Sequence, residues 1–458
     1  MGAIITLSIL ALVVLYLGLF KAKKMLLPVS ILGFLAAIGF LWNDWSSTTG
    51  ALYSGMVYFD HFAIAFSIVC VAITLCIFVI SKGYFDEEGQ VAEYYSLLIF
   101  SLTGAVLVNS YHNFSMLFLG IEIMSVALYI LVGIRKKDKV SNEAALKYFL
   151  MGAFSTGFLL FGIALLYGAT GSFDLSQIKS YVVNNPQTIS PLFYGGILLL
   201  IVGLTFKVGA APFHFWTPDV YDGAPILITS YMSTVVKVAS FAGLLRLFSY
   251  SLLPLQEFWT PVFLIIAVIT LFVGNISALM QSSFKRMLAY SSVSHAGYML
   301  FAIIAVGATS ANAILAYGLA YSLATIIAFT GLILVKKTTG SEHFEAFNGL
   351  GKRNPMLALA ITIAMLSLAG IPLTAGFIGK FMMFSSVMEN YHVVLLVLAV
   401  INAGIAVYYY LKVVVAMYFR DSEESCVNVQ WNYSFVLFIA VGLTILIGVY
   451  PDCLLKLI

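Results

Sequence analysis

Long apolar segments follow one another along nearly the whole chain, and this feature limits what the chain can fold into. Runs of about 17 to 25 predominantly apolar residues, the length that a helix needs to cross a bilayer, alternate with polar connections. Of the 458 residues, 62% are hydrophobic and only 9% are charged, against about 25% charged residues in soluble domains. No soluble core of this size needs so much apolar surface. We therefore expect one all-α integral membrane domain over residues 1–458.

Fourteen membrane-spanning helices are predicted when the chain is divided at the polar segments between its apolar runs. We expect helices 1–3 over about 1–81, helices 4–8 over about 93–250, helices 9–13 over about 259–419 and helix 14 over about 432–451. Their approximate centres are Leu12, Gly33, Ile68, Leu102, Met124, Gly157, Leu200, Val238, Ala267, Phe301, Ser322, Ala369, Ala406 and Leu443.

The positions of the basic residues predict how the helices are oriented. If the N-terminus lies outside, 15 of the 23 basic residues fall in cytoplasmic loops, among them Lys285 and Arg286. Three, including Arg246 and Lys456, fall on the opposite side. Cytoplasmic loops carry the excess of Lys and Arg in membrane proteins. We therefore expect a multi-pass protein of the bacterial inner membrane with both termini on the periplasmic side.

Two of the predicted helices are interrupted. Helix 7 runs into Gly209 and Pro212, and helix 12 contains Gly370, Pro372 and Gly376. Glycine and proline leave backbone groups without helical partners, which is tolerated only beside packed protein or a cavity. Interruptions at matching places in two halves indicate an inverted repeat, and a five-helix unit reverses its orientation when repeated. The sequence thus predicts two inverted five-helix repeats, although the two halves share too little identity to prove it.

Six ionisable residues lie inside the predicted helices, where each charge costs about 2.5 kcal/mol or more. A buried lysine can load and release a proton, which arginine cannot do. We therefore take Glu122, Lys207, Lys237 and Lys380 as candidates for a proton path. The competing interpretations are a structural salt bridge for Glu122 and a side chain that reaches to the membrane surface for each lysine. The six residues are Glu122, Lys147, Lys207, Lys237, Lys380 and Lys412.

Four further side chains, together with one acidic neighbour, could relay protons. Lys412 lies near the cytoplasmic end of helix 13, where reaching to the surface is a real alternative. Lys147 stands four residues after Glu143, so a structural ion pair is at least as plausible as a relay. His214 follows the helix-7 break and His295 lies inside helix 10. Histidine can shuttle a proton through either ring nitrogen, although a single helix histidine is usually a hydrogen-bonded core residue.

Several chemistries have no motif in this chain. There is no P-loop, no glycine-rich dinucleotide fingerprint, no haem or iron–sulfur ligand set and no nucleophile motif. We expect no metal site and no cofactor in the chain, and an outside partner must supply its energy. The four cysteines, which show no metal-ligand spacing, are Cys70, Cys76, Cys426 and Cys453.

Three stretches of sequence carry a family resemblance: residues 142–152, 203–225 and 285–298. They resemble signatures of the antiporter-like subunits of respiratory complex I, and the resemblance covers nearly the whole chain. Lys380, in the stretch 369–381, is similar to the subunit types that have a lysine in helix 12. No long extension follows helix 14, unlike in the subunit type of the family that carries one. Mrp-type cation/proton antiporters share the fold and are the alternative.

The resemblance implies roles for the candidate residues. Glu122 would gate proton uptake and tune Lys207, Lys237 would bridge the two halves, and Lys380 would be the terminal lysine. His295 would be a polar connection between them. The implied function is that of a proton-translocating membrane subunit of NADH:quinone oxidoreductase. The family keeps FMN, iron–sulfur clusters and quinone on other subunits. The implied partners are neighbouring antiporter-like and small helical subunits and lipid, with no nucleic acid.

Overall fold

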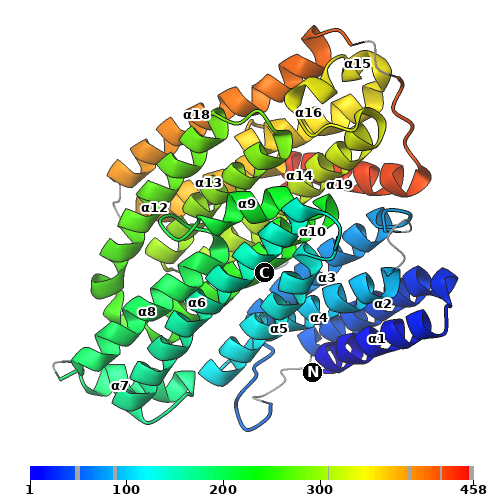
Figure 1. Ribbon diagram of the computed structural model, residues 1–458. Helices are drawn as coiled ribbons and strands as arrows, with labels where there is room; N and C mark the ends of the chain where they lie inside the picture. The colour runs from blue at the N-terminus through cyan, green and yellow to red at the C-terminus, as the bar shows by residue number, and fades with distance from the viewer. Residues whose placement is uncertain are drawn as a thin grey trace.

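The computed structural model of the chain describes residues 1–46, 52–85, 90–186, 188–307, 309–389, 393–422 and 425–452, and every named element within them is helical. Cys453 and Lys456 lie outside the described residues. The long helices run side by side along one common direction (Figure 1). The elements are α1 (Gly2–Leu19), α2 (Lys23–Ser46), α3 (His61–Ile80), α4 (Val91–Ser110), α5 (Phe114–Val132), α6 (Lys139–Thr170), α7 (Leu175–Asn184), α8 (Pro191–Val208), α9 (Trp216–Gly223), α10 (Ile226–Tyr231), η2 (Met232–Val236), α11 (Lys237–Arg246), η3 (Leu247–Ser251), η4 (Leu253–Leu255), α12 (Gln256–Leu279), α13 (Phe284–Ile304), α14 (Ser310–Thr339), η5 (Phe344–Phe347), α15 (Leu350–Arg353), α16 (Pro355–Ala369), α17 (Ala375–Glu389), α18 (Val393–Phe419) and α19 (Trp431–Val449).

The predicted number of membrane-spanning segments is confirmed. Within the described residues, 13 helices or continuous helical runs are long and apolar enough to cross a membrane. One of these runs, residues 226–251, joins α10, η2, α11 and η3. The two shorter apolar helices α16 and α17 together supply the fourteenth segment. All fourteen predicted centres lie within these helices.

Both predicted helix interruptions are present. Gly209 follows the last residue of α8 and Gly370 follows the last residue of α16, each in the left-handed conformation with φ of 72° and 85°. Glycine adopts this conformation without the steric cost that a Cβ imposes. Pro212 and Pro372 lie in the connections to α9 and α17. Each half of the protein therefore contains one helix that is broken and then resumed.

Gly376 differs from its prediction as a break residue, because it lies in the first turn of α17. A Cβ on Gly376 would stand 1.8 Å from the backbone oxygen of Ser367 in α16. The Gly376 N–H also donates to the Ser367 Oγ at 3.1 Å. Gly376 therefore permits the two half-helices to approach closely, and Gly370 makes the turn.

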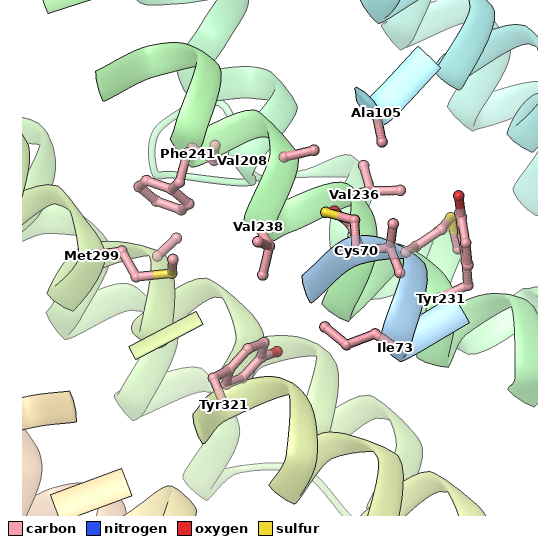
Figure 2. Packing of buried hydrophobic residues seen from close by; sticks show 14 of the residues in the cluster. Cys70, Ile73, Ala105, Val208, Tyr231, Val236, Val238, Phe241, Met299 and Tyr321 are labelled. Carbon is pink, nitrogen blue, oxygen red and sulfur yellow. The ribbon is translucent and has the colours of Figure 1, made fainter. Parts of the chain in front are cut away.

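The centre of the protein is the helical run 226–251, whose apolar segment is entirely buried and which packs against α13 and α14. Figure 2 shows Cys70 of α3, Val238 of α11 and Met299 of α13 among the buried side chains around this run. By contrast, α1, α2, α6 and α18 bury only about a third of their apolar segments. Apolar side chains such as Phe154, which is 70% exposed, face outward, as expected for a surface that meets lipid.

Two π-helical turns interrupt the central run, a feature that the sequence analysis did not predict. The turn η2 ends directly before Lys237, and η3 follows Arg246. Turns of this kind widen a helix locally and are frequent at functional sites. Lys237 therefore lies at a local widening of the central helix.

Equivalent helices pack together in the two predicted repeats. The pair α4 and α5 corresponds to α12 and α13, and the contacts of α6 with α8 correspond to those of α14 with α16 and α17. This packing is what an inverted repeat would produce. The repeat itself stays a prediction.

Replacing Gly376 by alanine should prevent α17 from packing on α16, because the added Cβ would overlap a backbone oxygen. We expect little folded protein in the membrane, measured by immunoblot and by gel filtration in mild detergent. The matched control is Gly404→Ala in α18, where a Cβ meets nothing within 4 Å. A normal yield of the Gly376→Ala protein would contradict the close packing.

The short amphipathic helix α7 is held by His112, which makes it sensitive to pH. The His112 Nε2 is 2.8 Å from the Ser176 Oγ, and burial lowers the pKa of His112 below its usual value of 6.5 despite the nearby Asp174. A fold that keeps a histidine neutral loses stability where the unfolded chain can bind a proton there, near and below the usual histidine pKa of 6.5. The contact between His112 and Ser176 is therefore stable above about pH 6.5 and weakens as the pH falls below it.

Hydrogen exchange of the α7 backbone amides, corrected for its intrinsic pH dependence, should accelerate between about pH 7.5 and pH 5.5. The His112→Gln protein lacks the titrating group and should show no such acceleration. Equal behaviour of the two proteins would contradict a role of His112 in holding α7.

Candidate functional site

The first candidate group joins Lys207 of α8 to Ser125 and Glu122 of α5. The Lys207 side chain is 8% exposed, and its Nζ donates to the Ser125 Oγ at 2.7 Å. Glu122 lies one turn before Ser125, and one of its carboxylate oxygens is buried without a hydrogen-bond partner. Lys207 and Glu122 form no ion pair with any described residue. The two charges act on each other through space, without direct contact.

A small cavity lies beside Lys207, between α5, α6 and α8. It leaves about 10 Å³ for the centres of water molecules, roughly what one water needs, and its polar lining comes from Ser125, Tyr129, Ser155, Thr156 and Lys207. A cavity with several hydroxyl groups suits water, which needs two to four polar partners. Water there would complete the hydrogen bonds of the ammonium group.

The second lysine, Lys237, is 3% exposed at the start of α11. Its Nζ donates to the backbone oxygen of Ser292 and, at 2.6 Å, to the Ser292 Oγ. Both acceptors are neutral groups of α13, and Lys237 has no carboxylate within ion-pair distance among the described residues. Because its acceptors are neutral, a proton can leave Lys237 without stranding a buried carboxylate.

The third lysine, Lys380 of α17, reaches back into the break of its own helix. Its Nζ donates to the backbone oxygen of Ala369, the last residue of α16, at 2.8 Å. The ammonium also lies 5.0 Å from the centre of the Tyr298 ring. Lys207 precedes its helix break whereas Lys380 follows one, so the two lysines are not equivalent in position. Both nevertheless lie in an apolar helix beside a helix break.

His295 of α13 connects the regions of Lys237 and Lys380. Its Nδ1 is 2.6 Å from the Tyr317 hydroxyl, and its Nε2 is 3.0 Å from the Tyr410 hydroxyl. A small cavity with about 10 Å³ for the centres of water molecules is lined by His295, Tyr317, Ser367 and Lys380. Both ring nitrogens are thus engaged with hydroxyl groups that can accept or donate a proton.

The remaining candidates lie outside this row. Lys147 forms ion pairs with Glu143 at 2.8 Å and with Asp219 at 2.9 Å, the contacts expected of the structural alternative. Lys412 is half-buried and interacts with the Gln281 backbone oxygen at 3.4 Å and with the Phe344 ring.

His214 lies in the connection between α8 and α9 and is 7% exposed. Its Nδ1 is buried without a hydrogen-bond partner. The structure therefore gives His214 an unsatisfied nitrogen beside the helix break, but no contact with the three lysines.

Lys285, which the sequence analysis placed in a cytoplasmic loop, and Arg246, which it placed on the opposite side, are both buried in helices. Lys285 is the second residue of α13 and is 3% exposed, and Arg246 is the last residue of α11 and is 8% exposed. Arg246 pairs with Asp60 at 2.6 Å and donates to the Asn109 backbone oxygen. Partners far away in sequence offset the cost of burying them, and hydropathy does not register such partners.

No group of three or more His, Cys, Asp or Glu side chains that could hold a metal ion occurs among the residues that the structure describes.

Comparison with known proteins identifies the family. Residues 111–406 match the family described as NADH:quinone oxidoreductase/Mrp antiporter, TM. The NADH-quinone oxidoreductase subunit N of Flavobacterium psychrophilum is 39% identical over the full length of both chains. A chain of respiratory complex I from Thermus thermophilus is 32% identical with a TM-score of 0.85, covering 99% of this chain and 98% of that one. A chain of the Mrp complex from Dietzia, at 17% identity and a TM-score of 0.83 over 100% and 96%, shares the fold.

The broken helices and the buried lysines thus define an antiporter-like membrane subunit, the class that the sequence signatures suggested. Within that class, the chain belongs to the subunit N family of NADH-quinone oxidoreductase. The Mrp-type alternative is matched only distantly.

Replacing Tyr410 by phenylalanine should destabilise the protein, because the His295 Nε2 and the Ser291 Oγ both lose their contact with its hydroxyl. A buried polar group without a partner costs about 1–3 kcal/mol. We expect a lower midpoint in thermal unfolding of the purified protein. Tyr408→Phe is the matched control, since Tyr408 lies on the same helix and is 66% exposed. Equal midpoints would show that the Tyr410 contacts contribute little.

Proposed function

We propose that this chain carries protons across the inner membrane as a subunit of NADH:quinone oxidoreductase, driven by electron transfer from NADH to quinone in other subunits. The observation that carries the proposal is the row of buried lysines held by neutral acceptors. Lys207, Lys237 and Lys380 are bonded to a hydroxyl group or to backbone oxygens. A purely structural role would favour paired charges.

The proton path begins at Glu122, whose unpartnered oxygen can take up a proton. A change in the charge of Glu122 alters the field at Lys207, whose ammonium lines the small polar cavity between α5, α6 and α8, and Lys207 then releases its proton. Lys237 receives the proton next to Ser292, and His295 relays it between the Tyr317 and Tyr410 hydroxyl groups. Lys380 is the last station, within the α16–α17 break.

The orientation and the partners complete the proposal. The excess of basic residues in the predicted cytoplasmic loops supports a chain with both termini on the periplasmic side. FMN, the iron–sulfur clusters and quinone would be held by other subunits, and the outward apolar faces of α1, α2, α6 and α18 would meet lipid or neighbouring membrane subunits.

Removing the ionisable groups tests this proposal directly. In inverted membrane vesicles supplied with NADH, Lys207→Met and Glu122→Gln should each lower proton uptake by about tenfold or more, which corresponds to about 1.4 kcal/mol. Lys207→Arg should fail as well, because arginine keeps the charge but does not release its proton. Uptake would be followed with a pH-sensitive dye and NADH oxidation by absorbance.

The control for this experiment is Lys352→Met, which removes an exposed lysine that is ion-paired with Asp421 at 2.7 Å. It should pump at the normal rate. Normal pumping by the Lys207→Met and Lys207→Arg proteins, in complexes that contain the subunit in normal amount, would refute the proposed path.

A further inference from the structure

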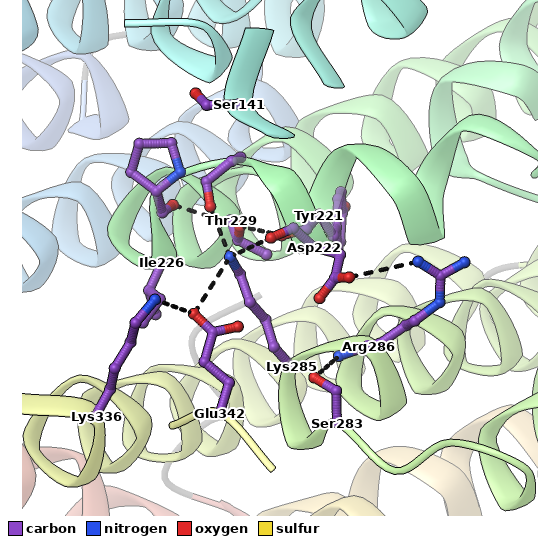
Figure 3. A network of polar contacts seen from close by, with 12 residues as sticks. Ser141, Tyr221, Asp222, Ile226, Thr229, Ser283, Lys285, Arg286, Lys336 and Glu342 are labelled. Carbon is purple, nitrogen blue, oxygen red and sulfur yellow. Dashed lines mark hydrogen bonds and ion pairs between the residues drawn. The ribbon is translucent and has the colours of Figure 1, made fainter. Parts of the chain in front are cut away.

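Lys285 is a buried cation that the proton path does not use. It lies at the start of α13 and is 3% exposed. Its Nζ donates to the backbone oxygens of Asp222 and Ala224, each at 2.6 Å (Figure 3). These oxygens belong to the end of α9, the second half of broken helix 7. A helix ends with unpaired carbonyl groups and partial negative charge, so Lys285 caps this half-helix.

The carboxylate nearest to Lys285 is shared with another lysine. The Glu342 Oε1 lies 3.9 Å from the Lys285 Nζ but 2.5 Å from the Lys336 Nζ. The Glu342 backbone oxygen also accepts the N–H of Phe284 at 2.9 Å. Glu342 therefore holds the end of α14 to the start of α13, and the end of α9 provides the closest partners of Lys285.

Charged side chains fasten α9 on two sides. Asp219 accepts hydrogen bonds from Arg286 of α13 at 2.8 Å and from Lys147 of α6 at 2.9 Å. Asp222 lies 3.4 Å from Arg286. With Lys285, these contacts tie a helix of the first predicted repeat to α13 of the second.

The other residues of α9 contact the surroundings of two lysines in the proton path. The Trp216 Nε1 donates to the Phe206 backbone oxygen at 3.0 Å, next to Lys207. Trp216 also stacks on Tyr148, the ring beside the Lys207 ammonium. Towards its other end, α9 packs against α13, the helix of Ser292, and the buried Tyr221 side chain interacts with Ser292 across this contact. The single short helix α9 therefore spans from the surroundings of Lys207 to those of Lys237.

The helix α13 continues this connection. Ser292 follows Lys285 by seven residues and His295 follows it by ten, so the three side chains lie along one side of the helix. Ser292 holds Lys237, and His295 lies between the regions of Lys237 and Lys380. A rigid α13 therefore relates the position of α9 to every later step of the path.

We propose that Lys285 is a positioning residue that ties α9 to α13 and so keeps the surroundings of Lys207 and Lys237 in a fixed mutual geometry. This inference rests on the proposed proton path and adds a residue that neither carries nor exchanges the transferred proton. Without the ammonium, the last carbonyl groups of α9 lose their cap and the packing of α9 on α13 loosens. Proton transfer between the two lysines then slows although both remain present.

The test uses the assembled complex in inverted membrane vesicles. Lys285→Met should lower NADH-driven proton uptake by roughly tenfold, with the subunit present in normal amount. Lys336→Met is the matched control, because Lys336 shares Glu342 but does not touch α9; it should pump normally. Lys285→Arg retains charge and donors and should recover part of the rate. A normal rate for Lys285→Met would overturn the inference.

A double-variant cycle separates positioning from general destabilisation. If Lys285 acts through α9, Tyr221→Phe should slow proton uptake in the normal protein but cause no further loss in the Lys285→Met protein. Independent, additive losses would overturn the inference. If the Lys285→Met protein does not assemble, Asp219→Asn provides a second test. It weakens the contact between α9 and Arg286, and it should show the same non-additivity with Tyr221→Phe.

The result for Lys207→Met distinguishes the two proposals. If Lys207→Met abolishes pumping while Lys285→Met pumps normally, only the positioning role fails. If Lys207→Met pumps normally, the proton path fails and the positioning role fails with it.

Discussion

The cost of placing a charge inside a membrane is the constraint on which the rest of this structure depends. An ammonium group in hydrocarbon needs acceptors, and a continuous α-helix offers few because its carbonyl groups are already bonded internally. The chain provides acceptors in three ways: a serine hydroxyl for Lys207, a serine backbone oxygen with its own hydroxyl for Lys237, and the open end of a half-helix for Lys380. The helix breaks, the small cavities and the dense central packing follow from this need.

The charged groups of the protein are arranged in two different ways. Near the predicted cytoplasmic side, acids and bases alternate from Glu143 and Lys147 through Asp219 to Arg286, so that each charge is balanced by its neighbours. In the interior, the lysines face neutral acceptors. Paired charges hold elements together, whereas an unpaired lysine can change its protonation state at lower cost. The contrast separates the groups that hold the fold from those suited to carry protons.

Much of the fold was predictable because the bilayer imposes strong rules on sequence. Apolar length predicted fourteen segments, and glycine with proline predicted both breaks. The positions that were missed depend on contacts between distant segments. Gly376 looked like a break residue, but its role is to admit the Ser367 backbone. Lys285 looked like a loop residue, since nothing nearby in sequence reveals that the end of α9 receives it. The π turn beside Lys237 likewise has no local signal.

The bond between Lys380 and Ala369 has a mechanical consequence. The lysine belongs to α17 and the carbonyl group to the end of α16, so this bond spans the joint between the two half-helices. A charged donor binds a carbonyl oxygen more strongly than a neutral amine does. If Lys380 carries the transferred proton as proposed, the joint between α16 and α17 is stiffer while the lysine is charged and more flexible once the proton has left.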